Sequence, residues 1–356
     1  MKDKVRVAVV GTGWWATYAH IPGLLAHESA ELVALCDKDK TKVETTADAY
    51  NIEKAYDNVE TMLAHERLDG VVVATNHASH YMVAKPCLVR GIHVLIEKPM
   101  TLYAAEAKKL VELAQANNCE ISIGYNANYT PYAARARELI SSGILGQVQY
   151  ISGIFNQHII ELLRGSAAVN SGFQEKVHSP GAVYSDPQLS GGGHGHLQIT
   201  HLAGLLFSLT GLRAQSVSAR MHKHGLAVDL VNAILVTFES GALAAIGGTS
   251  NIPGGRKIDL QIFCEHGWVD IDDALGVAAI HGEKIRSEHF APTVENSTAT
   301  DRFASTDNLV DRILGRAQNG APGEVGWRAV EVLDAAYRSA AEAGRPVLIE
   351  ELYTNE

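Results

Sequence analysis

The sequence predicts an α/β protein with an N-terminal doubly wound parallel sheet and a C-terminal α+β domain that contains a large, mainly antiparallel open sheet. Three observations support this. Up to residue 123, short apolar runs alternate with helical segments, and a glycine turn joins the first run to the first helix. After residue 124 the alternation stops, and strand-like runs follow one another with hairpin signals between them.

The stretch 4–16, KVRVAVVGTGWWA, passes from an apolar strand through glycines into a helix. Gly11, Gly13 and Ala16 have the G-x-G-x-x-[G/A] spacing of a dinucleotide-binding turn. Gly11 permits the tight turn, Gly13 lets the main chain approach a pyrophosphate, and Ala16 lets the helix pack closely. The helix N-terminus then favours the diphosphate. This pattern predicts a Rossmann domain.

The alternating half reads as repeated strand–helix units, which place ligands at the carboxyl ends of the strands. We expect strands near 5–10, 32–36, 70–74, 93–96 and 120–123, and helices near 14–27, 39–50, 58–66, 79–90 and 103–117.

Asp37 ends the second strand at about the 20-residue offset expected of an acid that binds the adenosine ribose. Its carboxylate can accept from both ribose hydroxyls and would repel a 2′-phosphate. We therefore expect NAD as the cofactor, with NADP the less favoured form. An ordinary turn residue is the alternative for Asp37, and Lys38 and Lys40 leave dual use open.

The third and fourth strand ends carry the residues expected to face the nicotinamide. The polar segment Thr75-Asn76-His77 follows an apolar run, although simple helix capping, which fits Ser79 best, is the alternative for this segment. The complete set of predicted cofactor contacts is Gly11, Thr12, Gly13, Trp14, Trp15, Asp37, Thr75, Asn76, His77, His80, Glu97 and Lys98.

At Glu97-Lys98-Pro99 the chain resembles the glucose–fructose oxidoreductase / inositol dehydrogenase / MocA (Gfo/Idh/MocA) family of NAD(P)-dependent sugar and polyol oxidoreductases. The resemblance covers nearly the whole length. It rests on the glycine turn, the strand-end acid, GIHVLIEKP, ISSGILGQV, the triple glycine at 191–193 with His201, and EVLDAAYRSAAEAGRPV.

The resemblance implies that Lys98 contacts both the substrate hydroxyl and the nicotinamide ribose, and that the Lys98–Pro99 bond is cis. The residue chemistry agrees, because a desolvated lysine at a crevice can have a lowered pKa and exchange a proton with an alcohol. A surface lysine is the alternative.

The second half should begin near residue 125, which divides the chain into a domain of residues 1–124 and one of residues 125–356. A last helix near 324–343 is expected to pack back on the first domain. The family resemblance adds that the open sheet face often forms the subunit interface, so we expect a homodimer or homotetramer. Strands are expected near 147–157, 214–222, 227–238, 242–249, 257–264 and 268–271.

The irregular stretch 159–190 reads as a working loop. The triple glycine follows it and precedes a helix that runs to Leu209, and in the resembling family a His at the position of His201 flanks the reacting carbon. Lys98 and His201 are therefore the predicted catalytic pair. The predicted substrate contacts are Lys98, Asn126, Tyr184, Asp186, His194, His196, Gln198 and His201.

Three departures from the family pattern affect this prediction. Leu197 occupies the usual Asp or Asn position, and the neighbouring Gln198 can orient a group but cannot titrate. His201, with an ordinary pKa near ~6.5, can still act with Lys98. Asn76-His77 and Asn128 replace Pro-Asn and Arg, which makes the pocket less basic and favours a neutral sugar, glycoside or polyol.

The composition excludes several classes of function. With 356 residues, 46% hydrophobic and 20% charged, the chain has the balance of a soluble two-domain protein, and no apolar run approaches the ~18 residues of a membrane helix. A net charge of −10 argues against nucleic-acid and membrane partners. The first strand begins almost at once, so we expect no signal peptide and a cytoplasmic location.

The metal chemistry of the sequence is weak. The four cysteines lie far apart in apolar patterns and are expected to be reduced core residues. His194 and His196 have an H-x-H spacing, but a third ligand lacks support, so no metal is predicted.

These observations together predict an NAD-dependent dehydrogenase that transfers hydride between nicotinamide and a secondary alcohol or ketone of a carbohydrate or cyclitol. Two alternatives stay open. One is a redox-assisted glycosidase with tightly held NAD. The other is a dinucleotide-binding regulatory protein without chemistry, which the Leu197 replacement makes a real possibility.

Overall fold

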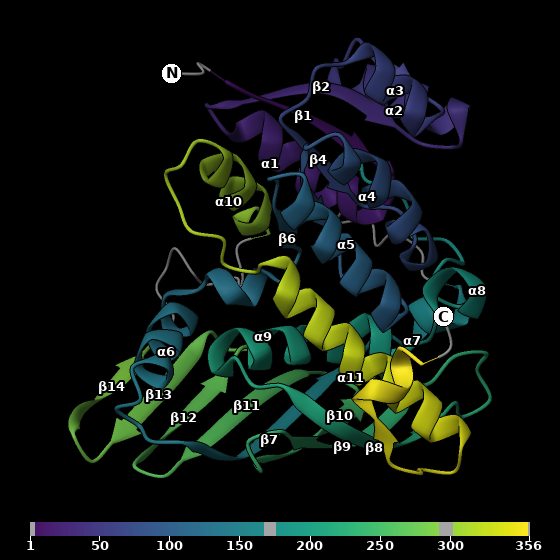
Figure 1. Ribbon diagram of the computed structural model, residues 1–356. Helices are drawn as coiled ribbons and strands as arrows, with labels where there is room; N and C mark the ends of the chain where they lie inside the picture. The colour runs from purple at the N-terminus through teal and green to yellow at the C-terminus, as the bar shows by residue number, and fades with distance from the viewer. Residues whose placement is uncertain (1–3, 167–175, 292–301, 355–356) are drawn as a thin grey trace.

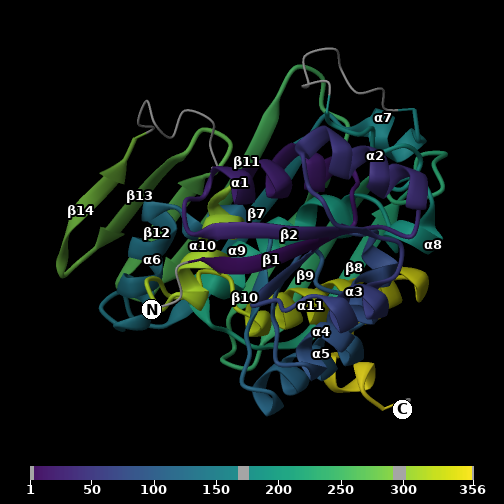
Figure 2. The same ribbon diagram turned by 90° about the horizontal axis from the view of Figure 1, so that it is seen from above.

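The computed structural model describes residues 4–166, 176–291 and 302–354. It contains two sheets with helices between them. Figure 1 shows the parallel sheet and its helices above, the large sheet below, and helices on the upper face of the large sheet. Figure 2, the view from above, shows the first strands lying across the large sheet.

The N-terminal sheet has six strands in the order β3-β2-β1-β4-β5-β6, and all of its paired strands are parallel. The doubly wound prediction is confirmed. After β1 the chain adds β2 and β3 on one side of it and then crosses back to add β4, β5 and β6 on the other side. This reversal of direction creates the crevice where such folds bind ligands. The strands are β1 (Val5–Val10), β2 (Ala30–Cys36), β3 (Ala55–Tyr56), β4 (Gly70–Val73), β5 (His93–Ile96) and β6 (Ile121–Ile123).

Helices cover both faces of this sheet, which explains why its strands are almost wholly apolar. Their starts follow local chemistry: the Asp39 side chain accepts from the Lys42 N–H at the start of α2, and Asn58 does the same for Thr61 in α3. The helical elements are η1 (Ala16–His20), α1 (Ile21–Ala26), α2 (Lys40–Tyr50), α3 (Val59–His65), η2 (His77–Ser79), α4 (His80–Val89) and α5 (Ala104–Ala116).

The second sheet has nine strands in the order β14-β13-β12-β11-β7-β10-β9-β8-β15. Among the described strands of this sheet, only the β7–β10 pair is parallel, so the predicted, mainly antiparallel sheet is confirmed. The last three strands along the chain, β13, β14 and β15, were not predicted. The strands are β7 (Val148–Gln157), β8 (Ala214–His222), β9 (Val231–Phe238), β10 (Leu243–Thr249), β11 (Arg256–Cys264), β12 (Gly267–Asp272), β13 (Val277–Gly282), β14 (Ile285–Phe290) and β15 (Val347–Leu348).

The expected irregular stretch 159–190 is wrong in part, because its described residues include two short helices; residues 167–175 lie outside the described part of the chain. The helical elements of the second half are η3 (Asn126–Tyr129), α6 (Pro131–Ser141), α7 (Ile160–Arg164), α8 (Pro187–Ser190), η4 (Gly195–Ile199), α9 (Thr200–Thr210), α10 (Ala304–Ile313), α11 (Gly323–Ala341) and η6 (Ile349–Leu352).

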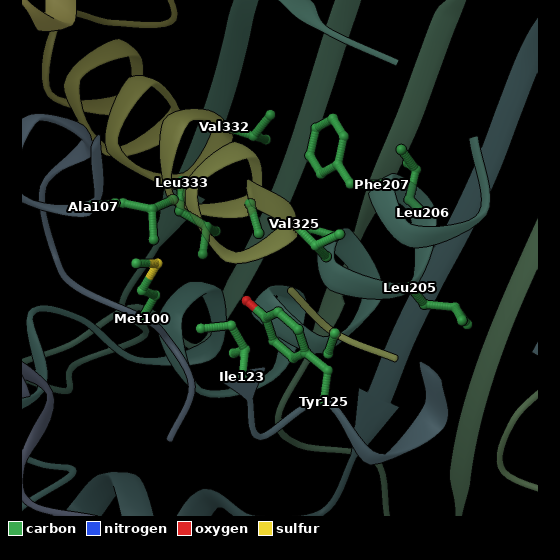
Figure 3. Close-up of a cluster of buried hydrophobic side chains, with 14 of the residues drawn as sticks. Met100, Ala107, Ile123, Tyr125, Leu205, Leu206, Phe207, Val325, Val332 and Leu333 are labelled. Atoms are coloured by element: carbon green, nitrogen blue, oxygen red, sulfur yellow. The ribbon is translucent and has the colours of Figure 1, made fainter. Parts of the chain in front are cut away.

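Helix α11 joins the two halves. It packs against α5 as well as against α9 and β8, and Asp334 accepts a hydrogen bond from the Ala104 N–H at 3.0 Å. Figure 3 shows the shared core, in which Leu333 of α11 lies near Met100 and Ile123. The last helix therefore contacts α5 of the first half. Within the described residues, no helix has both the length and the apolar character needed to cross a membrane.

Candidate active site

A cleft of about 1180 Å³ lies between the two halves and is lined by residues of both. At its N-terminal side are Gly11, Gly13 and the strand-end segment of β4. Lys98, which follows β5, also lines the cleft from the first half, and His201 in α9 lines it from the second half. The carboxyl ends of the parallel strands thus open onto the sheet-covering helices of the second half, which is where such folds bind ligands.

The first glycine of the turn is required by its backbone. Gly11 has φ +92°, and a Cβ there would lie 2.5 Å from the Ala74 carbonyl oxygen. Gly13 differs, because the nearest atom to a Cβ at that position is the Lys42 Nζ at 4.0 Å. Gly13 therefore faces open space in the cleft.

Asp37 sits at the end of β2 within a dense set of donors. Its Oδ2 accepts from the Thr12 N–H at 2.8 Å, the Thr12 hydroxyl at 3.0 Å and the Lys42 ammonium at 3.2 Å, and its Oδ1 accepts from the Asp39 N–H at 3.1 Å. Burial acts to raise the pKa of Asp37, but the Thr12 hydrogen bonds and the Lys42 charge outweigh it, and the pKa is lowered. The carboxylate is therefore ionised, and Oδ1 retains capacity for a ribose hydroxyl.

Two predicted cofactor contacts do not line the cleft. Thr12 is fully buried and acts on Asp37 instead. His80 is also buried, with Nδ1 2.8 Å from the Pro99 carbonyl and Nε2 3.2 Å from the Thr75 carbonyl. Both residues support the loops that face the cavity, which corrects the expected direct contacts.

The other predicted nicotinamide-side residues do line the cleft. They are contributed by the glycine turn and by the ends of β4 and β5, so parallel-strand topology gathers them at one edge. The set is Trp14, Trp15, Thr75, Asn76, His77, Glu97 and Lys98.

Lys98 reaches from the end of β5 toward the second half. Its Nζ donates to the Leu197 carbonyl at 3.2 Å, and the Lys98–Pro99 bond is cis as expected. Burial lowers the pKa of Lys98, and the Glu97 carboxylate offsets part of that effect. An amine with a lowered pKa can exchange protons near neutral pH.

Leu197 lies in the π-helical turn η4, in which the Thr200 N–H reaches back to the Gly195 carbonyl. Such turns are frequent at functional sites because they disturb the regular pairing of main-chain groups. The Leu197 side chain packs in an apolar cluster with Ile160 and Leu163 and also lines the cleft. Position 197 therefore presents an apolar side chain to the cleft and a carbonyl that binds Lys98.

His201 lines the cleft with its ring between two aromatic side chains. The ring centroids lie 6.2 Å from Tyr125 and 6.0 Å from Phe155. Burial holds the pKa of His201 well below its ordinary value, and the charges of Lys98 and Arg256 act in the same direction. Gln198 also lines the cleft, but no hydrogen bond joins it to His201 within the described residues.

Hydrogen bonds to Asp229 and close packing against Tyr337 explain the triple glycine. The buried Asp229 carboxylate accepts from the Gly193 N–H at 2.7 Å, the Gly195 N–H at 2.9 Å and the Tyr337 hydroxyl at 2.7 Å. A Cβ at Gly192 would overlap the Tyr337 hydroxyl. These contacts fix the start of η4, the turn that presents Leu197 to Lys98.

Three predicted substrate contacts are not brought to the cleft. His194 is buried with Nδ1 2.8 Å from the Ser250 hydroxyl, and burial lowers its pKa to about 4. His196 stacks on Tyr337 at 4.4 Å. Asp186 caps α8 by accepting from the Gln188 N–H. These contacts correct the prediction, because each side chain is used within the fold.

The remaining substrate-side predictions do reach the cleft. Tyr184 lines it and packs against His77 at 5.8 Å and Trp14 at 6.5 Å. Asn126 also lines it, and its buried Oδ1 has no protein partner within the described residues. That acceptor is available to a bound ligand.

Arg256 and Asp273 are charged cleft residues that were not predicted. Arg256, at the start of β11, lies 3.8 Å from Asp273 across an ion pair, and Asp273 also accepts from the Tyr132 hydroxyl at 2.6 Å. Neither sits in a motif, so only the tertiary fold reveals them. Among the described residues, no group of three or more His, Cys, Asp or Glu side chains is placed to hold a metal ion.

Two family models match the chain. Residues 5–125 match the oxidoreductase family with an NAD-binding Rossmann fold, and residues 133–270 match the GFO/IDH/MocA C-terminal domain. The chain belongs to the GFO/IDH/MocA family. The first half of this family member is accordingly an NAD-binding domain, and the Gly11 turn and the Asp37 carboxylate fit that cofactor.

Similar proteins include two named dehydrogenases and an uncharacterized oxidoreductase. Inositol 2-dehydrogenase of Corynebacterium glutamicum is 24% identical over 85% of this chain and 84% of that protein. D-xylose 1-dehydrogenase [NADP(+)] of Haloarcula marismortui is 28% identical over 45% of this chain and 46% of that protein. An uncharacterized oxidoreductase of Synechocystis is 28% identical over 84% of this chain and 80% of that protein.

Solved structures share the fold across almost the whole GFO/IDH/MocA chain. GenD2 from gentamicin A biosynthesis, in complex with NAD, has a TM-score of 0.76 at 24% identity and covers 97% of this chain and 96% of that one. The aldose-aldose oxidoreductase from Caulobacter crescentus has a TM-score of 0.75 at 21% identity, with 97% and 99% covered.

Proposed function

We propose that this GFO/IDH/MocA protein is an NAD-dependent dehydrogenase acting on a secondary alcohol or ketone of a sugar, glycoside or cyclitol. One observation carries the proposal: a single cleft holds the glycine turn with Asp37 at one side and Lys98 with His201 at the other. Such a cleft can align a carbinol carbon with a bound nicotinamide, which makes hydride transfer effectively unimolecular.

The chain's own residues account for the proton. When bound, NAD supplies the hydride acceptor. The neutral Lys98 amine accepts the proton of the substrate hydroxyl during oxidation and returns it during reduction. Burial favours that neutral amine, because it lowers the pKa of Lys98. His201, whose pKa is lowered further, lines the same cleft as a neutral imidazole and provides a second hydrogen-bonding group.

The charges in the cleft favour a neutral substrate. Arg256 is the cation on the side of His201, and the nearby Asp273 carboxylate at 3.8 Å offsets it. Asn126 and Gln198 offer amide groups that can bind hydroxyls. The relatives named for D-xylose and inositol act on compounds of the same chemical class, which supports a polyhydroxylated substrate.

Cofactor choice follows from the end of β2. The ionised Asp37 favours the free ribose diol of NAD over a 2′-phosphate, and Oδ1 is its available acceptor. The Lys42 ammonium, 3.2 Å from Oδ2, reduces the repulsion of a phosphate. We therefore propose NAD as the preferred cofactor. Lys42 should make the preference for NAD over NADP smaller than Asp37 alone would give.

The open face of the large sheet is proposed as the interface of a homodimer or homotetramer. Helices α6, α9 and α11 lie on the opposite face (Figure 1). On the open face, directly paired strands place an apolar row side by side, and Leu243, Tyr150 and Phe263 are 51%, 43% and 38% exposed. The row, which we call the aromatic ladder, consists of Leu243, Tyr150, Phe263, Trp268 and His281.

The test is a panel of sugars, inositols and glycosides assayed for reduction of NAD by absorbance. Net NADH accumulation with a simple sugar or cyclitol supports the dehydrogenase and excludes the redox-assisted glycosidase as the main activity. Release of an aglycone without net NADH would favour the glycosidase. Tight NADH binding without turnover on any member of the panel would favour a regulatory protein.

A further inference from the structure

Beneath Lys98 lies a buried pair that joins the glycine turn to the end of β5. His20, the last residue of η1, is fully buried, and its Nε2 lies 2.8 Å from Oε1 of Glu97. The other oxygen of Glu97 accepts from the Lys98 N–H at 3.2 Å. A Cβ at Gly124 would overlap Oε1 of Glu97, so this carboxylate has no free space on that side. Its geometry is therefore fixed from three directions.

The hydrogen bonds indicate which group carries the charge. A carboxylate only accepts, so the imidazole must donate through Nε2. The His20 Nδ1 is buried and has no partner in the described part of the chain. The Glu97 carboxylate thus accepts a hydrogen bond from a fully buried imidazole, and this bond stabilises its negative charge.

The Glu97 charge acts on groups from every element packed around it. Burial acts to raise the pKa of Glu97, but the bond from His20 and the Lys98 charge outweigh this, and the pKa is lowered. The same carboxylate favours the charged form of Lys98 and disfavours ionised phenols nearby. The titratable groups that face Glu97 or Lys98 are His20, His77, His80, Tyr125, Tyr129, Tyr184 and His201.

We propose that His20 is a positioning residue: it keeps Glu97 ionised below Lys98 and thereby sets the proton affinity of the Lys98 amine. The consequence for catalysis rests on the proposed role of Lys98 as proton acceptor. The electrostatic link itself does not, because it can be measured without any substrate.

The sign of the effect is fixed. Without the donor of His20, the buried Glu97 carboxylate loses its stabilising hydrogen bond and binds a proton more readily. Loss of that negative charge removes a force that raises the pKa of Lys98. The Lys98 amine then becomes neutral at a lower pH. In the oxidation direction, the acid limb of kcat/KM, below which Lys98 is protonated, moves to lower pH.

The experiment measures acetylation of Lys98 by acetic anhydride as a function of pH, quantified by mass spectrometry on the full chain. His20→Ala and the ring-retaining His20→Phe remove the donor, and Glu97→Gln removes the charge. Each should lower the midpoint for Lys98 labelling by about one pH unit, the effect of losing one close charge. His20→Gln retains an N–H donor and should restore most of the wild-type midpoint.

The controls distinguish a specific effect of His20 on Lys98 from a nonspecific effect of mutation on the fold. His65→Ala removes an exposed histidine whose Nδ1 lies 2.7 Å from the Thr61 carbonyl and whose ring stacks on Tyr56, and the Lys98 midpoint should not move. Adding His20→Ala to Glu97→Gln should give no further shift, because both act through one charge. Circular dichroism and Tm report whether each variant is folded.

Two results overturn the proposal. One is an unchanged Lys98 midpoint in a folded His20→Ala or His20→Phe variant. The other is an unchanged midpoint in Glu97→Gln, which decides the matter even if the donor-free variants fail to fold. Failure of the proposed dehydrogenase activity is distinct, because labelling would still shift while no substrate is turned over.

Discussion

Lys98 Nζ donates to the main-chain carbonyl of Leu197 across 3.2 Å, from the end of β5 to the π-helical turn η4. This contact crosses from one half of the molecule to the other. The acceptor is an uncharged main-chain carbonyl, and the Leu197 side chain packs in an apolar cluster. Among the described residues, Glu97 is the carboxylate whose charge acts on the pKa of Lys98.

Leu197→Asp tests this relationship. A carboxylate beside Lys98 should favour the ammonium, raise its pKa and move the acid limb of the oxidation kcat/KM upward by about one pH unit. Leu197→Asn, which has the same shape without charge, is the control and should leave the limb in place. If the acid limb of kcat/KM fell at the same pH in the two variants, position 197 would not act on Lys98 through charge.

Lys98→Met keeps much of the stem volume and removes the amine. Loss of a proton-transfer group typically costs about 10²–10⁴-fold, so kcat should fall within that range while NADH binding, followed by tryptophan fluorescence, persists. Lys40→Met, on the exposed start of α2, is the matched control and should retain kcat. Near-normal turnover by a folded Lys98→Met protein would remove Lys98 from the proposed chemistry.

His201→Asn separates the two proposed proton-handling groups. Because burial holds the pKa of His201 well below its ordinary value, the ring stays neutral when pH falls through about 6.5. An acid limb above that pH therefore belongs to Lys98. The variant should lose about 10²-fold in kcat/KM and keep the limb in place. A limb that vanishes in His201→Asn would reassign it to the histidine.

Asp37 and Lys42 should act oppositely on cofactor choice. Asp37→Ser removes the charge that repels a 2′-phosphate, so the ratio of kcat/KM for NAD over NADP should fall. Lys42→Met removes the cation that offsets this repulsion, so the ratio should rise. The expected rise is about tenfold, the effect of removing one charge near the protein surface. Kd values for NADH and NADPH give the same comparison without turnover. A wild-type preference for NADP would contradict the assignment of Asp37.

Phe263→Glu tests the aromatic ladder. A charge in the centre of a buried apolar patch would be desolvated without a partner, so the assembly should dissociate to monomers in sedimentation velocity. Thr45→Glu adds the same charge on exposed α2 and should leave the sedimentation coefficient unchanged. A wild-type protein that is monomeric at micromolar concentration would contradict the proposed interface.

Much of the fold could be read from local pattern. Strands β1 and β5 were predicted at their observed bounds, because buried parallel strands are apolar runs that end in glycine or polar residues. The glycine turn, Asp37 and the Lys98–Pro99 motif were also visible, since each is a short contiguous signal. Strands β13 and β14 were missed because their alternation is weak and half-exposed.

What the sequence determined by itself was therefore the class of fold, the dinucleotide turn and the identity of Lys98 and His201 as candidates, because these depend on neighbours along the chain. What only the tertiary structure decided was which side chains meet. His20 finds Glu97 across 77 residues, Lys98 finds the Leu197 carbonyl across 99, and His194 turns away to Ser250. Hydrogen bonds and burial act through space, and no local pattern encodes the partner of a buried polar group.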